Sequence, residues 1–384
     1  MMGKNTQWKD VYVQGTSTTK WGFFPDVSAS SMGSEAIVNA LRDARTKWGE
    51  VEAVFAGSVY QGTASGHRVV GEIGFTGIPI VNVENACSSG ATAFRLAYDS
   101  IRLGQYETVL AIGFEKMPRG PIPSTAFPGW QLAMGFNVQP ANYALETMEY
   151  MRQYGATVED FARVSVKNRR NGSLNPNARF QKEVSAEEVL QSAMIASPLR
   201  LLNCCPLADG AVAMVLTSKP ESNRAIHVAS SVLVSGVYGE ESYQSGITAS
   251  VQHYPSEGIV EKSARQAFEM AGYGPKDIDV VQAYDSMGPG ELWDIEKLGF
   301  CARGTAPELL REGVFDLMGR LPVNTDGGLL SRGHPLGATA LAQIHELVLQ
   351  LRGEAGHRQV ADPKLGLAHA MGAGPNSAVT ILQR

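Results

Sequence analysis

A cysteine and a histidine occupy equivalent positions in two similar stretches of the sequence. Cys87 begins CSSGATAFRLAYDSIRLGQ, and His334 begins HPLGATALAQIHELVLQLR. The stretches align without gaps and share Gly-Ala-Thr-Ala, and a strand-like run follows each, so we interpret them as an internal duplication. An imidazole that takes the proton of a neighbouring thiol is a common arrangement in nucleophilic catalysis. The duplication therefore makes Cys87 and His334 a candidate nucleophile and base.

The position of Cys87 favours chemistry over packing, although a free cysteine is most often a small buried hydrophobe. It lies between a short apolar strand and a helix, with Gly and Ser neighbours that let a backbone approach closely, and a helix N-terminus favours a thiolate. Cys204, Cys205 and Cys301 show no metal-ligand spacing, and we interpret all three as packing residues. The sequence therefore predicts one catalytic thiol and no metal site.

The elements that must position this pair alternate between helix and strand. Helical spacing in 34–47 precedes a buried strand-like run in 51–59, and the segments 259–272 and 278–286 repeat that order. This alternation is typical of an α/β protein with buried strands. The length of 384 residues exceeds what one hydrophobic core usually serves, so we expect two domains or a duplicated fold.

Composition narrows the classes of function. A net charge of -5 argues against a general nucleic-acid binder, which usually carries a basic excess. No apolar run approaches the roughly 20 residues of a membrane helix, and the N-terminus lacks the apolar core of a signal peptide. We therefore expect a cytoplasmic protein that contacts neither nucleic acid nor membrane.

The chain resembles the thiolase superfamily over nearly its full length, in the branch related to the sterol-carrier-protein thiolases. The motifs that carry the resemblance are NACSSG around Cys87, SPLRLLNCCPLADGAVAMVL (197–216), NTDGGLLSRGHPLGATA (324–340) and HAMGAGPNSAVTIL (369–382). The resemblance implies two βαβαβαββ halves packed as a five-layered αβαβα sandwich with an inserted loop domain. The expected parts are 1–117 with 201–225 as the N-terminal half, 118–200 as the inserted cap, and 226–384 as the C-terminal half.

The resemblance also implies roles. Cys87 is expected to accept an acyl group as a thioester, His334 to take its proton, and backbone amides near Cys87 and at Gly372 and Gly374 to form an oxyanion hole. The implied reaction is cleavage of a 3-oxoacyl-CoA by coenzyme A, or the reverse Claisen condensation, with coenzyme A as co-substrate and no tightly bound cofactor. The basic run 167–172 is expected either to contact CoA phosphates or to be a solvated helix end.

The second catalytic cysteine of ordinary thiolases, in a Cys-x-Gly motif, is replaced here by His369. The sterol-carrier branch has a cysteine in His-Asp-Cys-Phe, where this chain reads Tyr-Asp-Ser-Met at 284–287. Our first candidate to move the proton of the α-carbon is His369, with Tyr284 as a hydrogen-bond donor or alternative acid. We interpret Ser286 as filling space.

Divergent relatives with the same Tyr-Asp-Ser departure act with a small partner that carries an OB-fold and a zinc ribbon. They include thiolases for aromatic or branched acyl-CoAs, carbon acyltransferases, and retro-aldolases. Aromatic residues of the insertion, Phe127, Trp130 and Phe136, favour a bulky or aromatic acyl group. The remaining alternative is a non-catalytic thiolase-like scaffold. Relatives form dimers or tetramers, so we expect a homodimer or homotetramer.

Overall fold

A mixed sheet of nine strands organises the computed structural model, which describes residues 8–120, 132–134, 138–236, 257–373 and 376–384. Within these residues the first half contributes, in spatial order, β3 (Ile80–Val83), β2 (Val54–Gly57), β4 (Thr108–Glu115), β7 (Gly210–Thr217) and β1 (Tyr12–Thr18). The second half continues with β8 (Ile226–Ser235), β11 (Asn376–Gln383), β10 (Leu365–Gly372) and β9 (Val280–Gln282). A short antiparallel ladder between β1 and β8 joins the halves.

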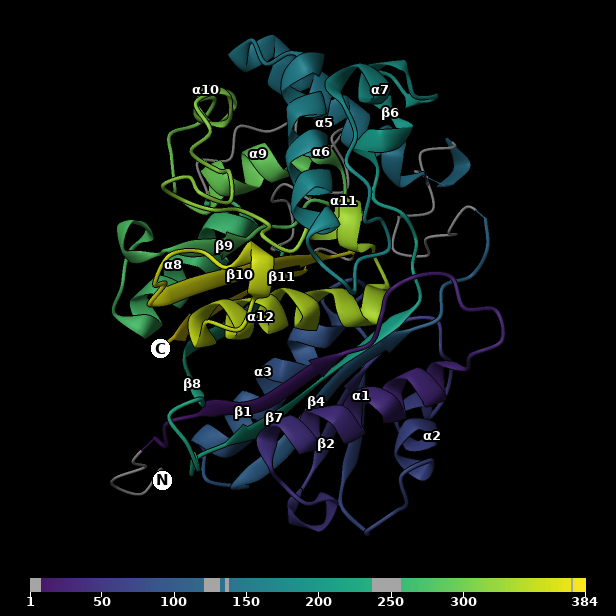
Figure 1. The fold of residues 1–384 in the computed structure, drawn as a ribbon, viewed down its shortest axis with the longest axis vertical. Helices are drawn as coiled ribbons and strands as arrows, with labels where there is room; N and C mark the ends of the chain where they lie inside the picture. Colours follow the sequence, from purple (N-terminus) through teal and green to yellow (C-terminus); the bar gives the residue numbers. More distant parts are fainter. Residues whose placement is uncertain (1–7, 121–131, 135–137, 237–256, 374–375) are drawn as a thin grey trace.

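Helices cover both halves and also lie between them (Figure 1). On the outer face of the first half, α1 (Ala29–Ala44) packs against β1 and β7, with α2 (Ser65–Gly71) beside it. Between the halves lie α3 (Ser89–Arg102) and α12 (Leu336–Arg352), which contact each other and strands of both halves. The outer face of the second half is covered by α8 (Ile259–Ala271), which packs against β8 and β11. The predicted αβαβα layering is confirmed.

The repeated Gly-Ala-Thr-Ala tetrad lies where the two central helices meet. A Cβ atom on Gly90 would lie 2.7 Å from the carbonyl oxygen of Gly337, and one on Gly337 would lie 2.7 Å from that of Phe114. Both distances are too short for a side chain, so glycine at position 90 allows α3 to approach α12, and glycine at position 337 allows α12 to approach the end of β4. The duplication seen in the sequence is therefore a packing requirement at the centre of the fold.

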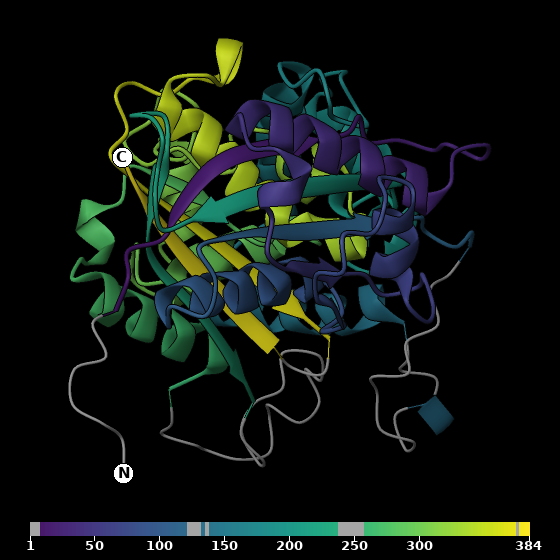
Figure 2. The same cartoon turned by 90° about the horizontal axis from the view of Figure 1, so that it is seen from below.

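The inserted segment packs over the second half (Figure 1) and lies on the far side in Figure 2, which is seen from below. Its elements are α5 (Gln139–Tyr154), α6 (Val158–Ser173), α7 (Ala186–Gln191), β5 (Met194–Ala196) and β6 (Leu199–Arg200). They contact α9 (Gly288–Lys297), α10 (Ala306–Arg311) and α11 (Gly328–Arg332). Single 3-10 turns span Trp48–Glu50, Leu201–Asn203, Pro275–Asp277 and Gly356–Arg358.

The basic run at 167–172 is solvated at Arg170, as one of the two sequence alternatives expected, but two of its other side chains are buried. Lys167 is buried on α6, where its Nζ lies 2.9 Å from Oε1 of Glu291 and donates to the carbonyl of Val323 at 2.8 Å. Arg169 is also buried and stacks on Phe180. These two side chains neither face solvent nor reach for a phosphate, because the inward face of α6 carries them into the core. No helix among the described residues is long and apolar enough to cross a membrane.

Candidate active site

Cys87 lies on a tight turn between β3 and α3. Ala86 has a positive φ of 48°, a conformation rare for a residue with a side chain. The turn is held by Ser88 N–H, which donates to the carbonyl of Asn85 at 3.0 Å, and by the Ser89 hydroxyl, which donates to the carbonyl of Ala86 at 2.6 Å. These bonds present the thiol at the start of α3, as the sequence predicted.

His334 lies at the equivalent position before α12 and is 5% exposed. Its Nδ1 lies 2.7 Å from the Thr339 hydroxyl, which donates its own proton to the carbonyl of Pro335 at 3.0 Å. Because that hydroxyl has one proton, Nδ1 of His334 must be the donor and Nε2 must carry the free lone pair. The imidazole is therefore held in the tautomer that a base requires at Nε2.

Tyr284 lies between Cys87 and His334 and contacts both. Its hydroxyl lies 3.4 Å from Nε2 of His334 and also hydrogen-bonds the thiol of Cys87. The Tyr284 and His334 rings meet edge to face, with centroids 5.9 Å apart. Three of the predicted catalytic residues therefore come together, and the phenol lies between thiol and base.

Burial sets the charge state of this group. Burial raises the pKa of the Cys87 thiol to about 11 against the opposing hydrogen bond from Tyr284, and the charges of Glu115 and Glu84 add smaller upward contributions. Burial, assisted by the charge of Arg332, lowers the pKa of His334 to about 3. The resting site thus holds a neutral thiol beside a neutral imidazole. The expectation that the helix N-terminus would favour a thiolate is wrong, because burial of Cys87 has the larger effect on its pKa.

The predicted proton carrier His369 is fully buried on β10. Its Nδ1 lies 2.7 Å from Oδ2 of Asp294, and its Nε2 lies 3.0 Å from the hydroxyl of Ser377. Asp294 Oδ2 also accepts the backbone N–H of Tyr284 at 3.0 Å. His369 therefore bonds the core through both ring nitrogens and reaches the catalytic group through Asp294 and the backbone of Tyr284.

Asp285, between Tyr284 and Ser286, anchors the loop that leads to His334. Its carboxylate accepts the backbone N–H groups of Leu329 at 2.7 Å and Leu330 at 3.2 Å, near the start of α11. Burial and the nearby charge of Glu291 raise the pKa of Asp285 to about 7. The two backbone hydrogen bonds are what position the loop.

The sequence analysis missed Tyr143, which α5 brings from the insertion to the site. The Ser286 hydroxyl donates to the Tyr143 hydroxyl at 2.8 Å, and the Tyr143 ring stacks on Trp293 with centroids 6.2 Å apart. Ser286 is thus engaged by the insertion rather than merely filling space. Nothing in the local pattern of α5 marks Tyr143, because only the packing of α5 on α9 brings it here.

Glu115 was also missed, and it supports the loop that follows β2 and the start of α12 beside His334. This buried carboxylate at the end of β4 accepts the backbone N–H groups of Val59 and Tyr60 at 2.9 and 3.0 Å and that of Gly337 in α12 at 3.1 Å. Burial raises the pKa of Glu115. A single acidic residue at the end of the apolar run TVLAIGFE was the one signal for it in the sequence.

The predicted oxyanion residues lie partly within the described part of the chain. A Cβ atom on Gly372 would lie 2.3 Å from the carbonyl oxygen of Asn85, so the end of β10 touches the turn that carries Cys87. Gly374 lies outside the described residues, as do Phe127, Trp130 and Phe136 of the insertion. The Cα atom of Gly372 therefore packs closely against the turn that carries Cys87.

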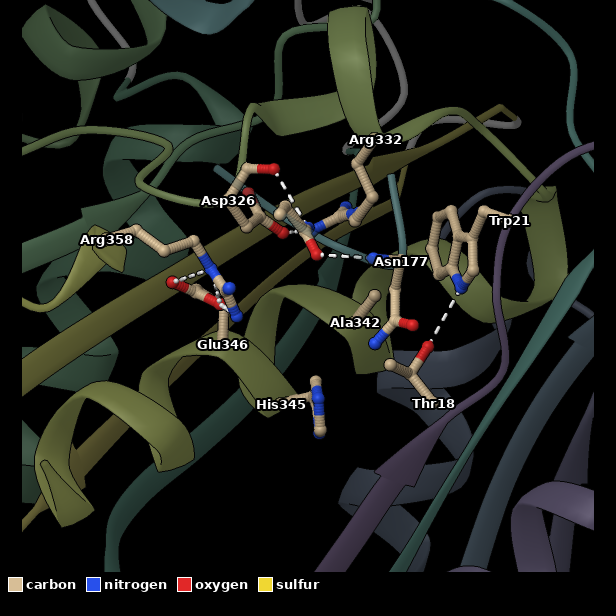
Figure 3. A pocket seen from close by; sticks show the side chains of 10 residues that line it. Thr18, Trp21, Asn177, Asp326, Arg332, Ala342, His345, Glu346 and Arg358 are labelled. Carbon is tan, nitrogen blue, oxygen red and sulfur yellow. Dashed lines mark hydrogen bonds and ion pairs between the residues drawn. The ribbon is translucent and has the colours of Figure 1, made fainter. Parts of the chain in front are cut away.

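Behind His334 lies a separate cluster of buried charges, shown in Figure 3. Arg332 pairs with Asp326, and Arg358 pairs with Glu346 at 2.9 Å. The cavity between them has a volume of about 10 Å³, which suits one water molecule and no acyl group. Its cation Arg332 is the one that disfavours a charge on His334. Among the described residues, no group of three or more His, Cys, Asp or Glu could hold a metal ion.

This arrangement is suited to acyl transfer. A thiol on a strained turn, a neutral imidazole with a free lone pair, and a phenol between them can transfer one proton as a sulfur–carbon bond forms. Amides at the N-terminus of α3 and at Gly372 can stabilise the developing oxyanion.

Two family models match the chain, "Thiolase, N-terminal domain" over residues 11–220 and "Thiolase C-terminal domain-like" over residues 241–384. The acetyl-CoA acetyltransferase of Methanothermobacter thermautotrophicus is 36% identical and covers 98% of this chain and 100% of its own length. Sterol carrier protein 2 of Oryctolagus cuniculus is 36% identical over 97% of this chain and 71% of its own length. The benzoylsuccinyl-CoA thiolase subunit BbsB of Thauera aromatica is 35% identical over 95% of both chains.

Among solved structures, the one named "Ltp2-ChsH2(DUF35) aldolase" superimposes with a TM-score of 0.86. It is 27% identical in sequence and covers 97% of both chains.

Proposed function

The chain belongs to the thiolase family and is an acyltransferase, and from this premise we propose that it cleaves a 3-oxoacyl-CoA with coenzyme A, or runs the reverse Claisen condensation, through an acyl thioester on Cys87. The observation that carries the proposal is the Tyr284 hydroxyl, which contacts both the Cys87 thiol and Nε2 of His334. A scaffold that performs no chemistry has no use for this arrangement.

The first half-reaction forms the acyl-enzyme. Because the thiol and the imidazole are both neutral at rest, the proton leaves Cys87 only as its sulfur attacks the 3-keto carbon, passing by way of the Tyr284 hydroxyl to Nε2 of His334. The tetrahedral oxyanion receives hydrogen bonds from amides near Cys87 and at Gly372, with Gly374 as the further predicted donor. The carbon–carbon bond then breaks, its electron pair moves to the α-carbon, and the acyl group stays on sulfur.

The second half-reaction uses coenzyme A as co-substrate. The thiol of coenzyme A gives its proton to the group that protonated the α-carbon and attacks the Cys87 thioester as a thiolate. The acyl-CoA is released, and the sulfur of Cys87 takes back the proton held by His334. The similar acetyl-CoA acetyltransferase and benzoylsuccinyl-CoA thiolase subunit are both named for CoA thioesters. An aromatic or branched acyl group is the substrate class we expect, and a panel of 3-oxoacyl-CoAs tests it.

The CoA thioester that leaves in the first half-reaction needs a proton at its α-carbon. His369 and Tyr284 are the two predicted carriers of that proton. Both ring nitrogens of His369 are hydrogen-bonded to Asp294 and Ser377 within the core. Tyr284 contacts the nucleophile directly. Of these two residues, Tyr284 contacts the catalytic pair itself, whereas His369 reaches the site through Asp294.

Intact-protein mass spectrometry after incubation with a short acyl-CoA tests the proposal. The expected result is an acyl adduct on the wild-type chain that is missing from Cys87→Ala. Absence of the adduct from the wild-type chain would overturn the proposed mechanism and leave the non-catalytic scaffold. Carbon–carbon cleavage that survives in Cys87→Ala would instead support a retro-aldolase, which needs no nucleophilic thiol.

We further propose a small partner protein with an OB-fold and a zinc ribbon. One similar protein is named as a subunit of its thiolase, and the similar aldolase structure is named for a DUF35 component. With such a partner, a carbon acyltransferase or retro-aldolase subunit is the alternative function. Co-expression followed by size-exclusion chromatography tests the complex, and full activity of the lone polypeptide would count against it.

We also propose a homodimer or homotetramer. Within the described residues β3 lies at one edge of the sheet, and Val81 on it is 39% exposed. Phe75, in the segment that leads into β3, is 66% exposed. An edge strand with apolar neighbours is suited to pairing with a second copy. Light scattering of the purified chain tests the assembly, and a monomer at micromolar concentration would refute it.

A further inference from the structure

The segment 204–207 bridges the loop that carries Tyr284 and the loop that carries His334. The backbone N–H of Cys205 donates to the carbonyl of Ser286 at 3.0 Å. One residue later, the carbonyl of Pro206 accepts the backbone N–H of His334 at 3.0 Å. Bridge pairings of Cys204 with Met287 and of Leu207 with His334 extend the same contact. Cys205 is therefore held between the two loops that form the active site.

The side chains of Cys204 and Cys205 point in opposite directions. Cys204 has an extended backbone, with φ of -105° and ψ of 139°, and successive side chains of an extended chain alternate between faces. The thiol of Cys204 donates to the carbonyl of Arg200 at 3.4 Å, so this thiol turns back toward its own 3-10 turn. The thiol of Cys205 is left to face the other side.

The side that the Cys205 thiol faces is the side of the nucleophile Cys87. Burial is the largest influence on the Cys205 thiol, followed by the charges of Cys204, Asp285 and Cys87, so Cys205 lies within electrostatic range of the catalytic turn and of the Tyr-Asp-Ser segment. Burial and these charges raise its pKa well above the ordinary value, so the group stays a neutral thiol. Like Cys87, Cys205 is half-buried rather than sealed in the core.

The other candidates for the α-carbon proton are already engaged. His369 is bonded at both ring nitrogens, Tyr284 shares its hydroxyl between Cys87 and His334, and the Ser286 hydroxyl donates to Tyr143. The S–H group of Cys205, held between the loops of Tyr284 and His334, is a further proton carrier at this site.

We propose that Cys205 is the second catalytic thiol of this site and carries the proton to and from the α-carbon, an assignment that rests on the proposed thiolase chemistry. In the cleavage direction the S–H bond of Cys205 breaks and a C–H bond forms at the α-carbon of the leaving thioester, which leaves a thiolate on Cys205. The incoming coenzyme A thiol returns a proton to that thiolate and attacks the Cys87 thioester as its own thiolate. Atoms and charge balance over the two half-reactions.

The test separates acylation from α-proton transfer. Wild type, Cys205→Ala, Cys205→Ser and the matched control Cys204→Ala are incubated with butyryl-CoA in D₂O. Mass spectrometry measures the acyl adduct on Cys87 and the deuterium at the α-carbon of the CoA thioester. For both Cys205 variants we expect the wild-type adduct and a loss of α-deuteration of about 100-fold or more, the scale of a lost general acid. Cys204→Ala is expected to match the wild type in both.

Each other outcome has a definite meaning. Deuteration within threefold of wild type in Cys205→Ala overturns the role of Cys205 while the acyl-enzyme stands. Loss of the adduct from both Cys205 variants, with an unchanged melting temperature, also overturns it, because the residue would then act on acylation. A wild-type chain that forms neither adduct nor deuterated product refutes the proposed function itself.

Discussion

The substitution Tyr284→Phe tests whether the phenol between Cys87 and His334 controls the charge of the nucleophile. It removes the hydroxyl that bonds the thiol and lies 3.4 Å from Nε2 of His334. The ring itself is 5% exposed and stays packed, so the change is confined to one oxygen.

The magnitude follows from the pKa of the nucleophile. With the Cys87 pKa at about 11, roughly one thiol in a thousand is ionised at pH 8. A hydrogen bond to a charged group contributes about 1.5–3 kcal/mol, which corresponds to about one to two pKa units. The Cys87 pKa of Tyr284→Phe should rise by that amount, and its thiolate fraction at a given pH should fall about 10- to 100-fold.

Alkylation by iodoacetamide, followed by peptide mass spectrometry, reads the thiolate of Cys87 directly. For the wild type we expect a rate that rises about tenfold per pH unit between pH 7 and 10, because the pKa lies above this range. The variant should give a parallel line about 10- to 100-fold lower. Tyr143→Phe is the matched control, because the hydroxyl that it removes bonds Ser286. A wild-type rate that is flat between pH 6 and 9 would show a thiolate at rest and refute the reasoning, as would equal rates in Tyr284→Phe and wild type.

Three further predictions concern stability and positioning. Burial lowers the pKa values of His334 and His345 to about 3, whereas a histidine in the unfolded chain has a pKa of about 6.5. Below pH 6.5 only the unfolded chain takes up protons at these residues, so the free energy of unfolding should fall by about 1 kcal/mol per histidine between pH 6.5 and 5.5. Urea denaturation of His345→Asn should show a smaller fall. Lys167→Met leaves Glu291 buried without its ion pair and should lower the free energy of unfolding in urea by about 3–5 kcal/mol. Arg170→Met, on the exposed face of the same helix, should lower it by less than about 1 kcal/mol. Equal losses would contradict the burial of Lys167. Gly372→Ala places a Cβ atom 2.3 Å from the Asn85 carbonyl and should slow formation of the acyl adduct at least about tenfold, since overpacking costs about 1–3 kcal/mol; an unchanged adduct rate would show that β10 does not position the Cys87 turn.

Pattern and duplication in the sequence determined the layout of the fold and two of its catalytic groups. Helical and strand-like periodicity repeats in both halves, and the aligned stretches at 87–105 and 334–352 became the paired central helices α3 and α12. The equivalence of Cys87 and His334 could be read without a structure, because a duplicated fold places equivalent positions symmetrically about its centre.

Contacts between segments far apart in the chain were decided by the tertiary structure alone. The sequence suggests that Lys167 is a surface charge, but the structure buries it. The face of α6 that carries Lys167 packs against the second half of the fold. The neutral state of Cys87 follows from burial that no local motif expresses. Tyr143 reaches Ser286 through the packing of α5, and two backbone hydrogen bonds hold the segment of Cys205 and Pro206 between the loops of Ser286 and His334. Periodicity records which face of an element is apolar, whereas the identity of the side chain across the interface depends on how all the elements pack together.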